Sequence, residues 1–177
     1  MLIKIIGSVI IFFCSNLLGL YYIFKTRSKI NNLKQISNAL DILKSEIEFG
    51  FNNLDQALKN ISHALILDQQ NNFIKSFFDN IALDLKKKNY SAKNIWLKQI
   101  NLLAKKIYID QDDIFNLKSF SQVISNLDYK LQINSLKKII LGLEQKILSL
   151  EKNYSSQKKL YFNLGFLSGL LIIIIFI

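Results

Sequence analysis

Hydrophobic residues follow two different patterns along this chain, and the change between them predicts the architecture. Residues 5–24 and 160–177 are apolar runs without a charged side chain. At about 1.5 Å per residue, each run is just long enough to cross the hydrocarbon core of a bilayer as a helix. Between the runs, apolar residues recur at intervals of three and four, which is typical of amphipathic helices. We therefore expect an all-α protein in which two transmembrane helices flank a helical bundle.

The predicted organisation has three parts. Residues 5–24 form the first transmembrane helix, 25–159 a central helical domain, and 160–177 the second transmembrane helix. The central domain is expected to be a bundle of about six helices. In it, residues about 25–49 and 129–159 make a membrane-proximal antiparallel pair, a stalk, with residues about 51–127 as a head at its tip. The alternative is one compact bundle, in which the apolar seam of the pair faces the head helices.

Two apolar seams support the antiparallel pair. Their members alternate at intervals of three and four before and after the head: Leu33, Ile36, Leu40, Leu43, Ile47, Leu136, Ile140, Leu143, Ile147 and Leu150. This spacing is typical of helices that pack lengthwise. The register of the second seam continues toward residue 160, so one long helix is expected to enter the second apolar run. Gly142 is placed to let the two backbones come close near Leu40.

Small residues spaced by four mark a possible packing face in each apolar run. They are Ser15 and Gly19 in the first run, and Gly165 and Gly169 in the second. Such pairs let helix backbones approach closely in lipid, which predicts packing between spans and a homo-oligomer. The alternative is that they are ordinary small residues facing lipid.

Charge predicts the orientation of the chain, whose formal net charge is +10. Basic residues flank the inner ends of both apolar runs: Lys25, Arg27, Lys29, Lys152, Lys158 and Lys159. Because basic flanks favour the cytoplasmic side, the central domain is expected in the cytoplasm. Its positive surface suits membrane lipids of an anionic leaflet or an acidic protein partner. Nucleic acid is not expected, since the basic residues are spread around helices without a recognised binding motif.

Residue types that catalysis needs are scarce. The chain has one cysteine, Cys14, and one histidine, His63, too few for an internal disulfide or a Cys/His zinc site. It has no Gly-rich phosphate loop, and Glu46 and Glu48 are two residues apart, so they point to different faces of a helix. We expect no enzyme, no catalytic residue, no cofactor and no metal site. The acidic residues at 110–113 are interpreted as the start of a helix.

Two motifs are specific enough to suggest a family. Residues 40–50 read Leu-Asp-Ile-Leu-Lys-Ser-Glu-Ile-Glu-Phe-Gly. The second motif, in the terminal apolar run, consists of Tyr161, Leu164, Gly165, Leu167, Gly169, Leu170 and Leu171. Further matches are Trp96, Phe120, Ile124, Asp128 and Gln132. On these residues the whole chain resembles the stage III sporulation protein AB family of spore-forming Firmicutes, with departures at Ser121 and Ser125, where glycines are usual.

The resemblance implies a non-enzymatic membrane platform component of a transenvelope complex between mother cell and forespore. The family is similar to the F-type platform proteins of type II secretion, so the implied partners are a cytosolic secretion-type ATPase and other membrane components of the complex. The implied location is the mother-cell membrane around the forespore. We predict a partner surface at Phe49, Gly50, Phe51, Lys86, Lys87 and Lys88.

Two other functions remain open from the residues. The first is a structural membrane scaffold that self-associates through its spans and seam without an ATPase partner. The second is a small pore-former, which the few polar residues within the apolar runs make a poorer fit, because they offer little lining for water.

Overall fold

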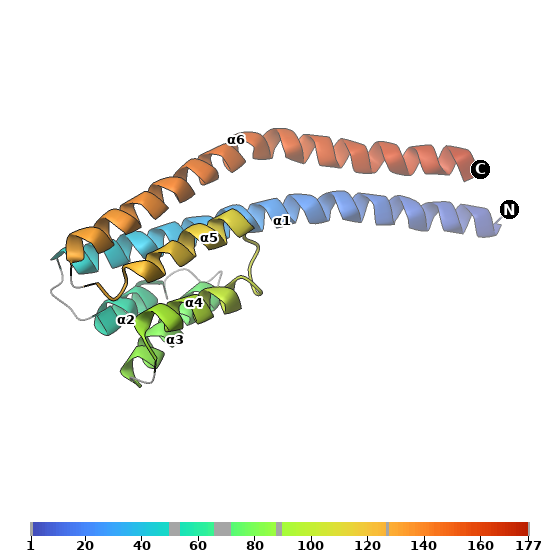
Figure 1. Ribbon diagram of the computed structural model, residues 1–177. Coiled ribbons are helices and arrows are strands. Elements are labelled where there is room, and N and C mark those ends of the chain that lie inside the picture. Colours follow the sequence, from blue (N-terminus) through green and yellow to red (C-terminus); the bar gives the residue numbers. More distant parts are fainter. Residues whose placement is uncertain (1, 50–53, 66–71, 88–89, 127, 177) are drawn as a thin grey trace. The chain divides into compact units, whose positions relative to one another are not determined.

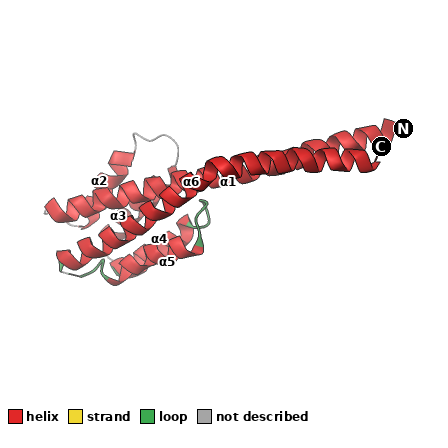
Figure 2. Cartoon of the chain, turned by 90° about the horizontal axis from the view of Figure 1, so that it is seen from above, coloured by secondary structure: helices red, strands yellow, loops and turns green. Residues whose placement is uncertain are grey.

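The computed structural model describes residues 2–49, 54–65, 72–87, 90–126 and 128–176. These residues form six α-helices and no strand. Figure 1 labels the helices, and Figure 2 colours them red. The helices are α1 (Leu2–Phe49), α2 (Leu54–Ala64), α3 (Asn72–Lys86), α4 (Ala92–Leu103), α5 (Gln111–Ser119) and α6 (Tyr129–Phe176), with a 3-10 turn η2 (Phe120–Gln122) after α5. The predicted all-α class is confirmed.

The helices α1 and α6 are 48 residues long each, and their length follows from the sequence. The chain contains no proline, so neither helix meets a residue that must interrupt its hydrogen bonds. α1 ends at Phe49, immediately before Gly50, which lies outside the described residues. α6 runs without a break into the second apolar run, as its register predicted.

The described chain divides into two compact units. Unit 1 consists of Met1–Ile30 and Leu148–Ile177, and unit 2 of Asn31–Ile147. The seam residues from Leu33 to Ile147 therefore belong to one unit with α2–α5. The division into a stalk and a head stays a prediction. An apolar stripe at intervals of three and four packs equally well on one helix or on several, so periodicity alone did not decide between the two arrangements.

Unit 2 is built around helices that each bury one face. Within it α3 packs against both α2 and α4. The largest fully buried side chains come from α1, α2, α3, α4 and η2, and include Leu33, Leu58, Ile74, Phe78, Trp96 and Phe120. At the start of α4, the side chain of Ser91 accepts a hydrogen bond from the backbone N–H of Asn94 and caps the helix.

The two ends of the chain were predicted to cross a membrane. A search of the described residues finds no helix that combines the length and the apolar character that a membrane span requires. The two spans are therefore not confirmed, and they stay predictions.

Candidate interaction surfaces

An aromatic cluster forms the centre of unit 2. The ring of Trp96 is fully buried and meets Phe77 and Phe120 edge to face, at centroid distances of 5.3 and 5.1 Å. Its Nε1 donates a hydrogen bond to the carbonyl of Leu117 at 2.9 Å. Because the one polar atom of this side chain is satisfied inside the core, Trp96 joins α3, α4 and the α5–η2 segment and takes a structural place.

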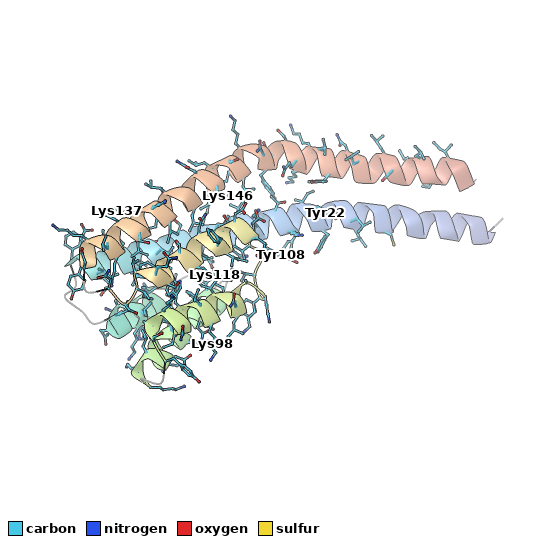
Figure 3. The ribbon with its side chains drawn as sticks, in the orientation of Figure 1. Tyr22, Lys98, Tyr108, Lys118, Lys137 and Lys146 are labelled. Carbon is cyan, nitrogen blue, oxygen red and sulfur yellow. The ribbon has the colours of Figure 1, made fainter. Side chains whose placement is uncertain are left out.

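The loop between α4 and α5 is held from both long helices. The buried amide of Asn32 on α1 donates to the carbonyl of Tyr108 at 3.1 Å. From α6, the Lys146 Nζ lies 3.1 Å from the Asp110 Oδ2 and 3.8 Å from the Asp113 Oδ1. Figure 3 labels Tyr108 and Lys146. This loop therefore joins the stretches of α1 and α6 that belong to unit 2.

The charge of Lys146 is stabilised where it lies. Burial lowers the pKa of its ammonium group, but the hydrogen bond to Asp110 and the charges of Asp113, Asp110 and Asp112 outweigh burial, so the pKa is raised above the ordinary 10.5. Asp112 and Asp113 stand in the first turn of α5, where negative charge also complements the helix dipole. The acidic residues at 110–113 thus mark a helix start, as predicted, and in addition hold α6.

A cavity lies between the end of α3 and the start of α4. Its volume is about 320 Å³, and it is lined by Asp84, Tyr90, Asn94, Ile95 and Lys98. The carboxylate of Asp84 is already engaged, because its Oδ2 accepts from the Gln99 amide at 3.2 Å and its Oδ1 lies 3.5 Å from the Nζ of Lys87. Lys87 is a member of the predicted partner surface. No sequence pattern indicates the cavity itself, and only the run of lysines at 86–88 pointed to this region.

The remaining residues of the predicted partner surface fall into two groups. Phe49 is 74% exposed at the end of α1, and Lys86 and Lys87 are exposed at the end of α3. Gly50, Phe51 and Lys88 lie outside the described residues. Within the described part of the chain, no cluster of three or more His, Cys, Asp or Glu side chains is arranged to hold a metal ion.

The predicted helix-packing residues are mostly buried in unit 2. Those with less than a tenth of their surface exposed are Leu33, Ile36, Leu40, Leu43, Leu136, Ile140, Leu143 and Ile147. Ile47, Leu150 and Gly19 are half-buried. The side chains at positions 15, 165 and 169 (Ser15, Gly165 and Gly169) are outside the described ones, so packing between spans stays a prediction.

One expectation about the seam is wrong. Gly142 was expected to let two backbones come close, but it is exposed, and a Cβ added there would meet no atom within 4 Å. The seam of α6 is made by the residues on either side, Ile140 and Leu143, which are buried. Gly142 is adjacent to the seam in sequence but points away from it, because consecutive helical residues are turned by about 100°.

The relationship of the chain to known proteins rests on a match along almost its whole length. A family model described as stage III sporulation protein AB matches residues 4–177. The chain belongs to the stage III sporulation protein AB family. It is similar to stage III sporulation protein AB of Bacillus subtilis strain 168, with 24% identity over 174 residues, which is 98% of this chain and 99% of that protein. A solved structure of SpoIIIAB shares the fold, with a TM-score of 0.63 and 22% identity over 72% of this chain and 96% of the other.

Membership confirms the resemblance and implies a component of a sporulation complex. Two of the residues that matched the stage III sporulation protein AB family, Asp128 and Gln132, have a structural role at the start of α6. Asp128 begins α6, since its Oδ1 accepts from the backbone N–H groups of Lys130 and Leu131 at 2.9 and 3.4 Å. Gln132 is buried, and its Nε2 donates to the carbonyls of Ile124 and Asn126 at 3.2 and 2.7 Å. These two motif residues therefore shape the turn into α6.

The tyrosines of unit 1 stand beside its basic residues. Tyr22 on α1 stacks on Tyr161 on α6, with ring centroids 5.5 Å apart and planes inclined by 15°. The next residue toward the N-terminus, Tyr21, meets Tyr22 edge to face. Basic residues stand close to both tyrosines of this stage III sporulation protein AB family member. Lys25 and Arg27 follow Tyr22, and Lys158 and Lys159 precede Tyr161.

Proposed function

We propose that this chain is a non-enzymatic membrane platform component of a sporulation transenvelope complex between mother cell and forespore. In this proposal it engages a cytosolic secretion-type ATPase through unit 2. The observation that carries the proposal is the family match over residues 4–177, which takes in both apolar runs and the helical domain between them.

The proposed location is the mother-cell membrane around the forespore, with residues 5–24 and 160–177 as spans and the central domain in the cytoplasm. Exposed apolar side chains on α1 and α6 support it, among them Leu17, Leu18, Leu164, Leu167 and Leu171. Tyrosines are enriched at the membrane–water interface, and basic residues on its cytoplasmic side. On both stretches the tyrosine lies at the border between the apolar run and basic residues, since Tyr22 is followed by Lys25 and Tyr161 comes just after Lys159.

A role in binding rather than catalysis is supported by how unit 2 uses its buried polar groups. The side chains of Asn32, Gln132 and Trp96 each donate to a backbone carbonyl, and so hold loops and helix ends in place. Groups that serve the fold in this way are not available to a substrate. In unit 2 the end of α3 and the start of α4 carry exposed lysines, Lys86 and Lys93, which are available to a partner.

The decisive experiment mixes the full-length chain, held in lipid nanodiscs, with the purified ATPase of the same complex. The proposal expects binding that survives washing and that empty nanodiscs do not give. Absence of binding at high micromolar ATPase, together with self-association of the chain in the nanodisc, would instead support the structural scaffold.

Three further experiments address the membrane, self-association and the complex. Extraction of membranes at alkaline pH should leave the chain in the pellet, and its release would contradict the two spans. The variant Gly165→Ile with Gly169→Ile should weaken self-association, because larger side chains keep helix backbones apart in lipid. Deletion in a sporulating host should arrest development after engulfment, and normal spores would contradict the role in sporulation.

A further inference from the structure

The surface around the cavity between α3 and α4 carries an unusual excess of positive charge. From Asp84 to Lys98 the sequence has five lysines and a single carboxylate, that of Asp84. α4 itself, Ala92–Leu103, contains Lys93 and Lys98 and no acidic residue. A surface of this kind attracts negatively charged partners and favours their approach.

The cavity offers donors to such a partner. Its one carboxylate, Asp84, is engaged by the amide of Gln99 and by the ammonium group of Lys87. Among the interactions of the described residues, no hydrogen bond or ion pair engages the side chains of Tyr90 or Lys98 that line the same cavity. A phenol hydroxyl and an ammonium group are therefore left facing an open space, together with the Asn94 side chain, whose amide can also donate.

Helix geometry brings these donors together. Asn94 and Lys98 are four residues apart on α4, so their side chains lie on the same face of the helix. Tyr90 precedes the capping residue Ser91 and is 68% exposed, which places an aromatic ring at the rim. Ile95, buried beside the cavity, fixes this part of α4 to the core. Figure 3 labels Lys98 on α4.

We propose that the cavity lined by Tyr90, Asn94 and Lys98 binds a carboxylate side chain from an acidic segment of a protein partner. The proposal deepens the function proposed above and rests on it, since it gives the surface of unit 2 that a protein partner uses.

Size and surroundings favour a protein segment over a free small molecule. A volume of about 320 Å³ is near the lower end of the range of about 300–1,000 Å³ for small-molecule pockets. It suits one or two side chains inserted from outside. The exposed lysines Lys86, Lys87 and Lys93 extend the positive surface beyond the cavity, so that neighbouring carboxylates of the same segment find partners too. An exposed tyrosine at the rim is typical of protein interfaces.

The test uses the full-length chain in nanodiscs of uncharged lipid and a fluorescein-labelled poly-glutamate peptide, followed by fluorescence anisotropy. Lys98→Glu is expected to weaken binding about tenfold, because it places a negative charge in the cavity. The matched control is Lys137→Glu, which makes the same charge change at an exposed lysine of α6 in unit 2, labelled in Figure 3. It is expected to change the affinity by less than about twofold.

A neutral variant separates the cavity from its charge. Tyr90→Ala keeps the net charge and is expected to weaken binding about threefold, because the aromatic rim is lost. Both Lys98 and Tyr90 are exposed, so these variants are expected to fold as the wild type does, which circular dichroism checks. Equal losses in Lys98→Glu and Lys137→Glu would overturn the proposal, since the peptide would then respond to net charge alone.

The same assay tests whether the cavity prefers a ligand other than an acidic protein segment. Inorganic phosphate or a single-stranded oligonucleotide that binds more tightly than poly-glutamate, and loses affinity in Lys98→Glu, would overturn an acidic protein segment as the occupant. The ATPase experiment distinguishes the two proposals. If the ATPase binds wild type and Lys98→Glu equally, the cavity proposal fails and the platform function stands. If poly-glutamate binds as expected and the ATPase does not bind, the platform function fails and the acidic-segment site stands.

Discussion

The two units of this chain use the same two helices in opposite ways. In unit 2, the α6 side chains Leu136, Leu143 and Ile147 have less than a tenth of their surface exposed. In unit 1, Leu164 and Leu167 of the same helix are 55% and 60% exposed. The inner face of α6 is therefore part of a protein core in unit 2, where only outward-facing leucines such as Leu131 and Leu141 are exposed, whereas Leu164 and Leu167 belong to an outer surface in unit 1.

The aromatic residues show the same contrast. Trp96 is fully buried in unit 2, with its N–H satisfied by a backbone carbonyl. Tyr22 stacks on Tyr161 in unit 1 and yet remains 49% exposed. Rows of exposed apolar side chains are rarely left in water, so the outer surface of unit 1 fits the lipid environment that we propose for it. Unit 2 is held by its core, whereas in the function that we propose unit 1 depends on the lipid around it.

The largest expected effect comes from Trp96→Ala. The substitution removes a fully buried ring and its contacts to Phe77 and Phe120, and is expected to lower the free energy of unfolding of unit 2 by about 3–5 kcal/mol. Urea unfolding followed by far-ultraviolet circular dichroism measures the change. Phe115→Ala is the control, because Phe115 is 74% exposed, and its expected effect is within about 0.5 kcal/mol. Similar values for both variants would mean that unit 2 lacks the core described here.

Much of unit 2 was predictable, since its helices are specified locally. Intervals of three and four placed Leu33, Leu40 and Leu143 on inner faces, and all three are buried. The absence of proline predicted long helices, and α1 and α6 are long. Trp96 was interpreted from its helical spacing as a core residue, and it is buried. Its hydrogen bond to Leu117, however, joins residues 21 apart, which no local pattern encodes.

The next effect in size is expected from Gln132→Ala. The variant leaves the carbonyls of Ile124 and Asn126 without the donor that holds the turn into α6, and is expected to destabilise unit 2 by about 1–3 kcal/mol. Fluorescence of Trp96, the single tryptophan, reports urea unfolding of unit 2 alone. Gln145→Ala, at an exposed position of α6 in the same unit, is the control and should leave the midpoint unchanged.

A smaller effect is expected from Lys146→Met. The partly exposed pair with Asp110 and Asp113 contributes up to about 1 kcal/mol. Because the pKa of Lys146 is raised in the folded chain, this contribution is fully present below pH 10.5, the ordinary value, and is lost as the pH rises through the higher folded value. Wild type should therefore lose more stability than Lys146→Met when the pH is raised from about 9 to about 11.5. The lower pH lies below the ordinary pKa of 10.5 and the upper pH lies above it.

The control for this pair is Lys137→Met, which removes an exposed lysine from the same helix. It should keep the alkaline loss of the wild type. If Lys146→Met shows the same loss as Lys137→Met, the ion pair does not stabilise unit 2.

The interactions that sequence reasoning missed join segments far apart in the chain. Lys146 and Asp110 are 36 residues apart, and Asn32 and Tyr108 are 76 apart. The residues around one partner of each pair contain no pattern that identifies the other partner. The cavity between α3 and α4 was missed for the same reason, because its lining residues were interpreted from helix ends and periodicity alone. The position of Gly142 was predicted wrongly, because the apolar spacing identifies the residues of the seam but does not show which side of the helix a residue between them faces.

A gain in stability is expected from Gly142→Ala. The added Cβ meets no atom within 4 Å, and alanine favours a helix interior over glycine by about 0.5–1 kcal/mol. The urea midpoint of Trp96 fluorescence should therefore rise. A fall would indicate that another helix approaches Gly142 closely, as the sequence first suggested. The comparison with Leu141→Ala, at an exposed neighbour, separates a helix-propensity effect from a general effect of this segment.

The smallest effect on unit 2 is expected from Tyr161→Ala. Tyr161 stacks on Tyr22 within unit 1, and such a pair contributes about 0.5–1.5 kcal/mol. In nanodiscs, backbone hydrogen exchange around residues 22 and 161 should accelerate by up to about tenfold, while the urea midpoint of Trp96 fluorescence stays within error. Tyr129→Ala, at an exposed tyrosine of α6 in unit 2, should change neither. If Tyr161→Ala instead lowers the stability of unit 2, the two units do not unfold independently, and the contrast between a unit held by its core and a unit dependent on its surroundings fails.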